Sequence, residues 1–225
     1  ATSSVATALI LIFAADTALW AIPALLLALA CASHAPRKAL FGETWSLGRY
    51  IEWRVRVVVA TLGFWILLAL TPAILASTPR PAQWTMAAAL VVTLLLWHHF
   101  YARILLASLG ATPLERRDLD PFFASVFDQT TAAVPTVWRA GAQGGIFANA
   151  LALPDTGRGR VVFFDTLLER LTPQEIAAIL AHEVAHLEHF DARRLRRQYF
   201  VTTVAGVGLV CASAALVAWA PARRG

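Results

Sequence analysis

The chain has 225 residues, of which 58% are hydrophobic and 15% charged, with a formal net charge of +5 at pH 7. Soluble domains contain roughly 45–50% apolar residues, so this share and the mean hydropathy of +0.62 exclude an ordinary soluble protein. The basic residues form no patch interleaved with aromatic side chains, so nucleic-acid binding is not predicted. The composition predicts a polytopic membrane protein in contact with the lipid bilayer.

Four apolar stretches approach the ~20 residues that a helix needs to cross the hydrocarbon core. They cover approximately residues 5–32, 56–77, 82–98 and 199–220. We therefore expect three spans with their loops over 1–110, a polar domain over 111–198, and a fourth span over 199–225. Asp16 lies inside the first span, where we expect it to face the protein interior, in a helix contact or along a substrate path.

The basic residues are unevenly distributed between the loops. They gather at 33–55 and 99–198, whereas the turn at 78–82 contains only Arg80. Cytoplasmic loops of membrane proteins carry an excess of Lys and Arg. We therefore predict a multi-pass protein of the inner (plasma) membrane whose polar domain faces the cytoplasm.

The polar segment contains two Thr-Pro-x-Glu patterns, each typical of a helix start with a capping box and proline at the first position. Thr112, Pro113 and Glu115 predict a helix to about residue 132, and the pattern at 172–175 predicts a second helix over about 173–198. Between them lie short β-prone runs separated by turn residues, which predict a short antiparallel β-meander. The fold class expected is predominantly α, with transmembrane helices and a small α+β domain.

The second of these helices contains "ILAHEVAHLEHFD", residues 179–191, with three of the six histidines of the chain. His182 and His186 are four residues apart, which places both imidazoles on one helical face. Glu183 is displaced by about 100° around the axis and can reach a metal-bound water without being a ligand. In this HExxH pattern two neutral imidazoles bind one Zn²⁺, and the glutamate takes a proton from the water that attacks a carbonyl.

The remaining histidines fit this pattern less well. His189 lies about 10 Å along the helix from His182, too far to share a metal with both other histidines. We expect it to support the site from outside, together with Asp191. His98 and His99 stand among aromatic residues at the end of the third span, so we assign them to the membrane interface.

The segment 149–191, "NALALPDTGRGRVVFFDTLLERLTPQEIAAILAHEVAHLEHFD", resembles the integral-membrane zinc metalloproteases that include the HtpX heat-shock proteases and the CAAX prenyl proteases. Asn149, Ala150 and Ala152 match a strand motif of that family, and the HExxH residues match its catalytic motif. The resemblance implies a zincin fold and endopeptidase activity. We take Asn149 and Ala150 as candidate substrate contacts, because a strand edge can align an extended peptide by strand addition.

In that family the third zinc ligand is a glutamate beyond the spans that follow HExxH, usually in a Glu-x-x-x-Asp pattern. No such pattern follows His186 here. We therefore expect the third ligand outside the present sequence, after a further span that returns the chain to the cytoplasmic side.

These features together predict a membrane zinc endopeptidase that hydrolyses peptide bonds of membrane or membrane-proximal proteins. Two alternatives stay open from the sequence. One is a CAAX-type protease that processes prenylated peptides, and the other is a non-proteolytic membrane scaffold with an incomplete zinc site.

Overall fold

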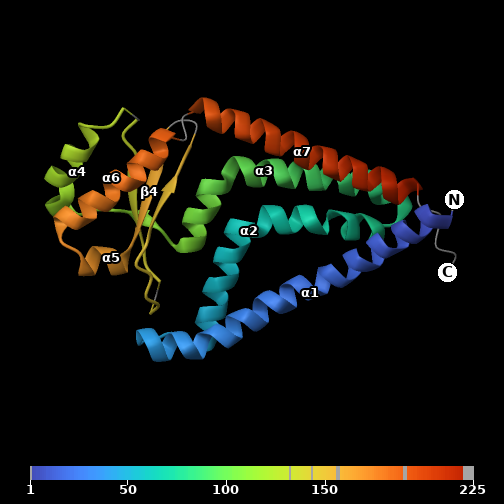
Figure 1. Cartoon of the computed structure of the whole chain (residues 1–225), viewed down its shortest axis with the longest axis horizontal. Helices are drawn as coiled ribbons and strands as arrows, with labels where there is room; N and C mark the ends of the chain where they lie inside the picture. Colours follow the sequence, from blue (N-terminus) through green and yellow to red (C-terminus); the bar gives the residue numbers. More distant parts are fainter. Residues whose placement is uncertain (1, 132, 143, 156–157, 190–191, 220–225) are drawn as a thin grey trace. The chain divides into compact units, whose positions relative to one another are not determined.

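The computed structural model describes residues 2–131, 133–142, 144–155, 158–189 and 192–219, without the side chains of residues 2–20, 22 and 192. The chain divides into two compact units (Figure 1). The first unit comprises residues 1–33, 58–101 and 201–225, and the second comprises residues 34–57 and 102–200. Each unit has its own cluster of buried hydrophobic residues.

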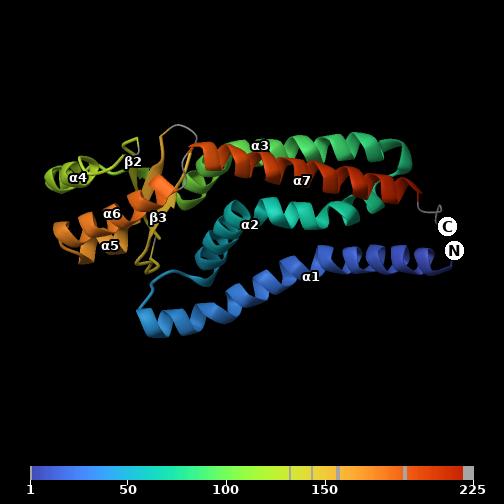
Figure 2. The same cartoon turned by 45° about the horizontal axis from the view of Figure 1, so that its top comes forward.

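The first unit consists of long apolar helices. They are contributed by α1 (Thr2–Phe41), α2 (Leu47–Ser77), α3 (Gln83–Leu109) and α7 (Ala192–Trp219), with the short η1 (Arg80–Ala82) before α3. Buried residues of α2, α3 and α7 share one core: Phe64, Leu75, Ala87, Leu90, Leu94, Val210 and Ala214. Figure 2 shows α3 and α7 lying side by side over this stretch.

Three helical segments of the described residues are long and apolar enough to cross a membrane: Leu47–Ser77, Arg80–Leu109 and Arg193–Trp219. They contain the second and third predicted spans and the fourth up to Trp219, so the prediction of a predominantly helical membrane protein is confirmed. The first predicted span, 5–32, falls within α1. Most of its side chains, including that of Asp16, lie outside the described residues.

The second unit contains a four-stranded sheet with the order β1-β2-β4-β3, formed by β1 (Thr112–Pro113), β2 (Thr136–Ala140), β3 (Ala150–Leu153) and β4 (Arg160–Phe164). The predicted antiparallel meander is wrong in one respect, because β2 pairs with β4 in parallel. Most of β4 is buried, which is typical of a central strand covered on both faces. Both β2 and β3 therefore pair with β4, and β3 forms an edge.

The first Thr-Pro-x-Glu pattern does not start a helix, contrary to the prediction for 112–132. Thr112 and Pro113 form β1, which pairs with Arg139 and Trp138 of β2. The Leu114 N–H also donates to the Val137 carbonyl, at 3.0 Å. Pairing with a distant strand thus outcompetes the local capping signal, and the helical structure follows later as η2 (Arg117–Leu119) and α4 (Asp120–Phe127).

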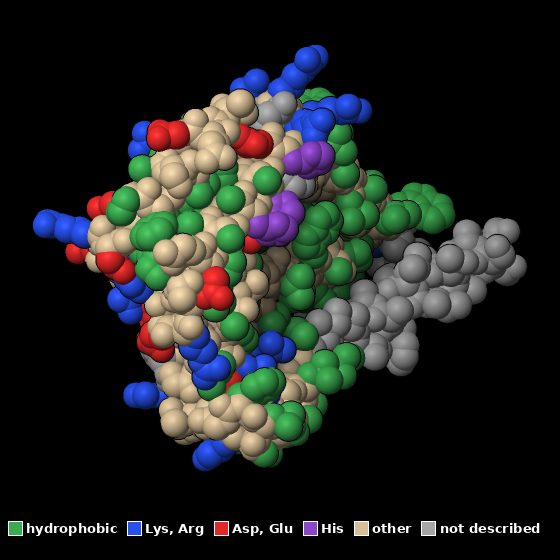
Figure 3. Space-filling view, turned by 60° about the vertical axis from the view of Figure 1, so that its left-hand side comes forward, with side chains coloured by type: hydrophobic (Ala, Val, Ile, Leu, Met, Phe, Trp, Pro, Cys, Tyr) green, Lys and Arg blue, Asp and Glu red, His purple; other side chains and the backbone are tan. Residues whose placement is uncertain are grey.

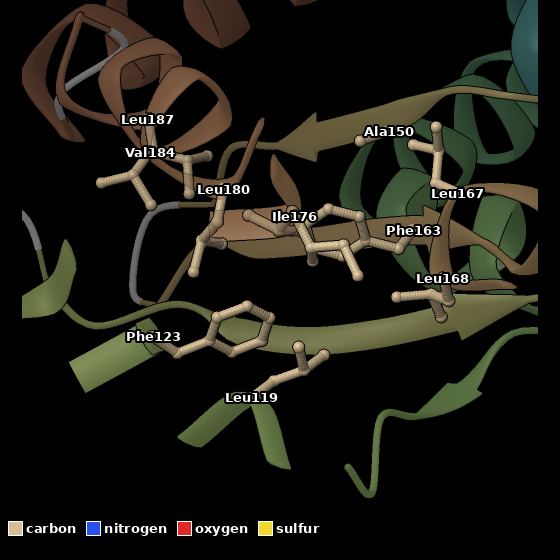
Figure 4. Packing of buried hydrophobic residues seen from close by; sticks show 11 residues of the cluster. Leu119, Phe123, Ala150, Phe163, Leu167, Leu168, Ile176, Leu180, Val184 and Leu187 are labelled. Atoms are coloured by element: carbon tan, nitrogen blue, oxygen red, sulfur yellow. The ribbon is translucent and has the colours of Figure 1, made fainter. Parts of the chain in front are cut away.

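Helices α5 (Asp165–Arg170) and α6 (Pro173–His189) complete the second unit. Its core lies between the sheet and the helices α4 and α6 (Figure 4), and the buried residues of this core are Leu119, Phe123, Ala150, Val161, Phe163, Leu167, Leu168, Ile176, Leu180, Val184 and Leu187. Of the helix predicted over 173–198, the structure describes α6 to His189 and the beginning of α7 from Ala192, and residues 190–191 lie outside the described residues. The Arg194 side chain donates to the His189 carbonyl at 2.9 Å, which satisfies a backbone acceptor at this helix end.

Candidate active site

Helix α6 begins with the capping box that the sequence predicts. The Thr172 N–H and hydroxyl both donate to Glu175 Oε2 at 2.8 Å, and the Glu175 N–H lies 3.4 Å from Thr172 Oγ1. The hydrogen bond from the Thr172 N–H, and after it the one from the Thr172 hydroxyl, hold the pKa of Glu175 below its ordinary value. Because the helix start is fixed, the residues that α6 buries and exposes are fixed as well.

One side of α6 faces the core and the other side carries the HExxH residues. The buried residues of α6 are Ile176, Ala177, Leu180, Val184 and Leu187. His182 and His186 are exposed, and Glu183 is half-buried. Figure 3 shows histidine side chains at the surface of this face, next to hydrophobic and basic side chains.

The two histidines of the motif lie in contact. Their Nε2 atoms are 3.2 Å apart, and their rings lie edge to face with centroids 4.7 Å apart. Two nitrogens that bind one tetrahedral zinc ion at about 2.0–2.1 Å are roughly 3.3 Å from each other. The donor atoms and their spacing therefore fit a shared zinc ion.

A pocket of about 290 Å³ separates this face of α6 from strand β3. Its lining residues are Ala150, Leu151, Ala152, Pro154, Glu183 and His186. The structure thus brings Glu183 and one histidine of the motif opposite Ala150, which lies more than thirty positions earlier in the chain. The carboxylate and the imidazole share a space that is large enough for a few residues of an extended peptide.

The edge strand β3 turns backbone groups away from the sheet. The Phe164 N–H donates to the Asn149 carbonyl at 3.1 Å, so Asn149 points its polar backbone groups toward β4. Neighbouring residues of an antiparallel strand alternate in this direction. Ala150 and Ala152 therefore direct their N–H and C=O groups to the open edge, where no strand of the described residues pairs. Asn149 itself is exposed just before β3.

The comparison with known proteins agrees with this arrangement. Residues 114–223 match the sequence model of peptidase family M48. Over 118 residues the chain is 33% identical to a protein named Protease HtpX homolog from Moorella thermoacetica. The aligned region covers 48% of this chain and 36% of that protein. The chain spans about a third of the length of the curated relative that it matches.

Two other polar residues near the end of α6 are in contact with other groups. Glu188 accepts hydrogen bonds from the Thr130 hydroxyl at 2.6 Å and the Thr131 N–H at 2.7 Å. The ring of His189 lies 3.2 Å from an Arg194 guanidinium nitrogen. Asp191 is outside the described residues. Among the described residues no group of three His, Cys, Asp or Glu side chains could hold a metal.

His98 and His99, assigned to the membrane interface from the sequence, lie in α3, His98 half-buried and His99 exposed.

Sequence reasoning missed two contributions to the region around β3. Leu151 and Pro154 complete the pocket wall, and no signal distinguishes them from other apolar residues. Glu43 is buried and bonded to the loop before β3. A signal for Glu43 existed, since it is the sole acidic residue of the basic stretch 33–51.

Proposed function

We propose that the chain is the catalytic part of a zinc-dependent membrane endopeptidase. His182 and His186 would each donate Nε2 to one Zn²⁺, and Glu183 would act as the general base. The observation that carries the proposal is the 3.2 Å separation of the two Nε2 atoms beside the pocket that Glu183 lines. The match of residues 114–223 to the sequence model of peptidase family M48 supports the same reaction class.

The zinc ion and the protein side chains would have different roles in the reaction. When bound, zinc polarises the scissile carbonyl and makes a water molecule acidic. The Glu183 carboxylate accepts the proton that the water loses as it attacks that carbonyl. Glu183 is half-buried and lines the same pocket as His186, which supports its role as the proton acceptor.

The peptide substrate would add as a strand to the open edge of β3. The outward N–H and C=O groups of Ala150 and Ala152 offer hydrogen bonds to an extended main chain. Asn149 is exposed at the beginning of this edge and would contact the peptide backbone beyond it. A peptide held there passes through the pocket that Glu183 and His186 line.

A catalytic zinc ion needs three protein ligands and a water molecule. Glu188 and His189 follow the motif on the same helix, but Thr130, Thr131 and Arg194 engage them. We therefore propose that the third ligand is a carboxylate from an element other than α6. The resemblance described above implies a glutamate beyond α7.

The site would lie on the cytoplasmic side of the inner (plasma) membrane and act on membrane or membrane-proximal proteins. The basic residues at 33–55 and 99–198 support this orientation. The three helices that could span a membrane support the proximity to membrane substrates.

Substituting Glu183 by glutamine tests the reaction directly. In the purified full-length protein, Glu183→Gln should lower turnover of an unstructured polypeptide by about 10²–10⁴-fold, the usual contribution of a general base. Zinc content, measured by mass spectrometry, should stay near that of the wild type, because both imidazoles remain. Glu188→Gln, the same change on the same helix, should retain turnover.

Three outcomes would contradict this proposal. Undiminished turnover in Glu183→Gln would exclude the carboxylate as the base. A wild-type protein that binds zinc without cleaving any peptide would favour the alternative of a non-proteolytic membrane scaffold. Cleavage of prenylated peptides alone would favour the CAAX-type reaction.

The orientation is testable by cysteine labelling in intact cells. With Cys31 and Cys211 replaced by serine, Arg80→Cys and Glu169→Cys each add one exposed thiol. A membrane-impermeant maleimide should label position 80 and leave position 169 unlabelled until the cells are opened. Labelling of position 169 in intact cells would reverse the proposed orientation.

A further inference from the structure

The loop between α1 and α2 contains a buried carboxylate. Glu43 is 2% exposed. Four donors surround its two oxygens: Arg37 Nη2 at 2.5 Å, Arg37 Nε at 3.2 Å, Trp45 Nε1 at 2.9 Å and the Ile146 N–H at 3.1 Å. A buried carboxylate is costly unless it is paired and hydrogen-bonded, so the position of Glu43 depends on all of these partners.

Glu43 is ionised at neutral pH. Burial raises the pKa of its carboxyl group, but hydrogen bonds from Arg37, Ile146 and Trp45, with the charge of Arg37, outweigh it and leave the pKa below 4.5. The charged form is the one that binds both Arg37 and the backbone of Ile146.

Through this carboxylate the α1–α2 loop holds a segment about a hundred residues away in the sequence. Glu43 accepts from the N–H of Ile146, and Arg37 Nη2 donates to the carbonyl of the same residue at 3.2 Å. The Thr44 N–H also donates to the Gly144 carbonyl at 2.9 Å. The ion pair therefore satisfies both backbone groups of Ile146.

Close packing reinforces these hydrogen bonds. A Cβ atom on Gly145 would lie 2.4 Å from the Trp45 ring, so only glycine allows the loop to approach this closely. The Arg37 guanidinium lies 4.7 Å from the centre of the Phe147 ring, and the Phe147 and Trp53 rings are 4.5 Å apart. Phe147, the residue after Ile146, thus contacts Arg37 of α1 and Trp53 of α2.

The anchored segment leads directly into β3. The Phe147 N–H donates to the Thr166 hydroxyl at 3.2 Å, and the Asn149 carbonyl accepts from Phe164. Ala150 begins β3 one residue later and lines the pocket with Glu183. The hydrogen bonds of Glu43 and Arg37 to Ile146 therefore hold the chain four residues before β3 begins at Ala150.

We propose that Glu43, held by Arg37, is a positioning residue that fixes the start of strand β3 and thereby sets the affinity for extended peptides. This role rests on the proposed function, in which the β3 edge aligns the substrate. Without the hydrogen bonds of Glu43 and Arg37 to Ile146, strand β3 can shift relative to the HExxH residues of α6. The hydrogen bonds between β3 and the main chain of the peptide then weaken. Glu43 touches neither the substrate nor the reacting atoms.

The variant Glu43→Gln in the full-length protein tests this role. The amide keeps the size of the side chain but loses the charge that pairs with Arg37. We expect KM for an extended peptide to rise about tenfold while kcat changes less than about twofold, because ground-state and transition-state binding weaken together. Hydrogen–deuterium exchange of the amides at 144–153 should become faster, with zinc content unchanged.

Glu52→Gln provides the matched control. Glu52 lies in the same part of the chain and pairs with Arg56, and this ion pair is exposed. KM and the exchange at 144–153 should match the wild type in this variant. A merely structural role for Glu43 would lower the amount of folded protein without changing KM.

The outcomes separate this inference from the function on which it rests. An active wild type with unchanged KM and unchanged exchange in Glu43→Gln would refute the positioning role alone. A zinc-loaded wild type without peptidase activity would refute the proposed function, and the role of Glu43 in substrate affinity with it. If Glu43→Gln fails to fold, Trp45→Phe removes one donor to Glu43 and keeps an aromatic ring. A rise in KM of about threefold is then expected, and an unchanged KM would refute the inference.

Discussion

Two short stretches of helix α6 carry the same residue types and differ in what those residues contact. In residues 182–186 the two histidine rings contact each other, and Glu183 and His186 line a pocket beside β3. Residues 188–189 contain a glutamate and a histidine that contact Thr130, Thr131 and Arg194. Partners from other elements thus decide which polar groups of one helix remain available for chemistry.

Helical geometry explains the position of Glu188. His182 and His186 are separated by four residues and lie on one face, whereas Glu188 is six residues from His182 and points about 240° around the axis. It therefore faces the end of α4 and not β3. Substitutions in the two stretches should have different consequences, and the following variants test this.

The largest effect is expected from His186→Ala. Two ligands already fall short of the three that a catalytic zinc ion needs, so the loss of one imidazole should remove stoichiometric zinc and all measurable turnover. Zinc analysis and peptide cleavage on the full-length protein measure both losses. Glu188→Gln is the control on the same helix and should keep zinc and activity. Loss of zinc in both variants would remove the distinction between the two stretches.

A smaller effect is expected from Glu188→Gln. The amide oxygen is a weaker acceptor than the carboxylate for the Thr130 hydroxyl and the Thr131 N–H, so the free energy of unfolding should fall by about 1 kcal/mol. Zinc content and kcat should not change. Chemical denaturation followed by circular dichroism measures the stability. A loss of zinc equal to that of His186→Ala would place Glu188 among the ligands.

The smallest effect is expected at the first turn of α6, from Glu175→Gln. The folded-state pKa of Glu175 lies below its ordinary value of 4.5, so its contribution to stability is present above pH 4.5 and disappears as the pH falls through the folded-state value. The variant should unfold at a lower temperature than the wild type at pH 7, and the difference should narrow below pH 4.5. Glu169→Gln, which removes an exposed acid outside the capping box, should show no such pH dependence. An equal difference at both pH values would exclude the charge as the cause.

The two Thr-Pro-x-Glu segments show how far local patterns predict this fold. At Thr172 the capping box forms and α6 begins, as the sequence predicts. At Thr112 the same pattern becomes a strand, because β2 offers backbone pairing. The sequence contains no local signal for this difference, since the pairing partner lies more than twenty residues downstream.

The order of the strands in the sheet and the hydrogen bond between Glu43 and Ile146 could not be predicted from the sequence either. Alternation and turn residues located the three longer strands, but they could not distinguish a meander from the order in which β4 is central. In the same way, Glu43 and Ile146 are distant in sequence, and only folding joins them.

The sequence by itself determined the apolar helices and the HExxH spacing, because hydropathy and helical periodicity are local properties that each segment carries wherever it lies. Tertiary structure alone decided that β3 is an edge, that Glu188 binds Thr130 and Thr131, and that the α1–α2 loop holds the segment before β3. These features depend on contacts between segments far apart in the chain, and the free energy of those contacts is not encoded in any one of the segments.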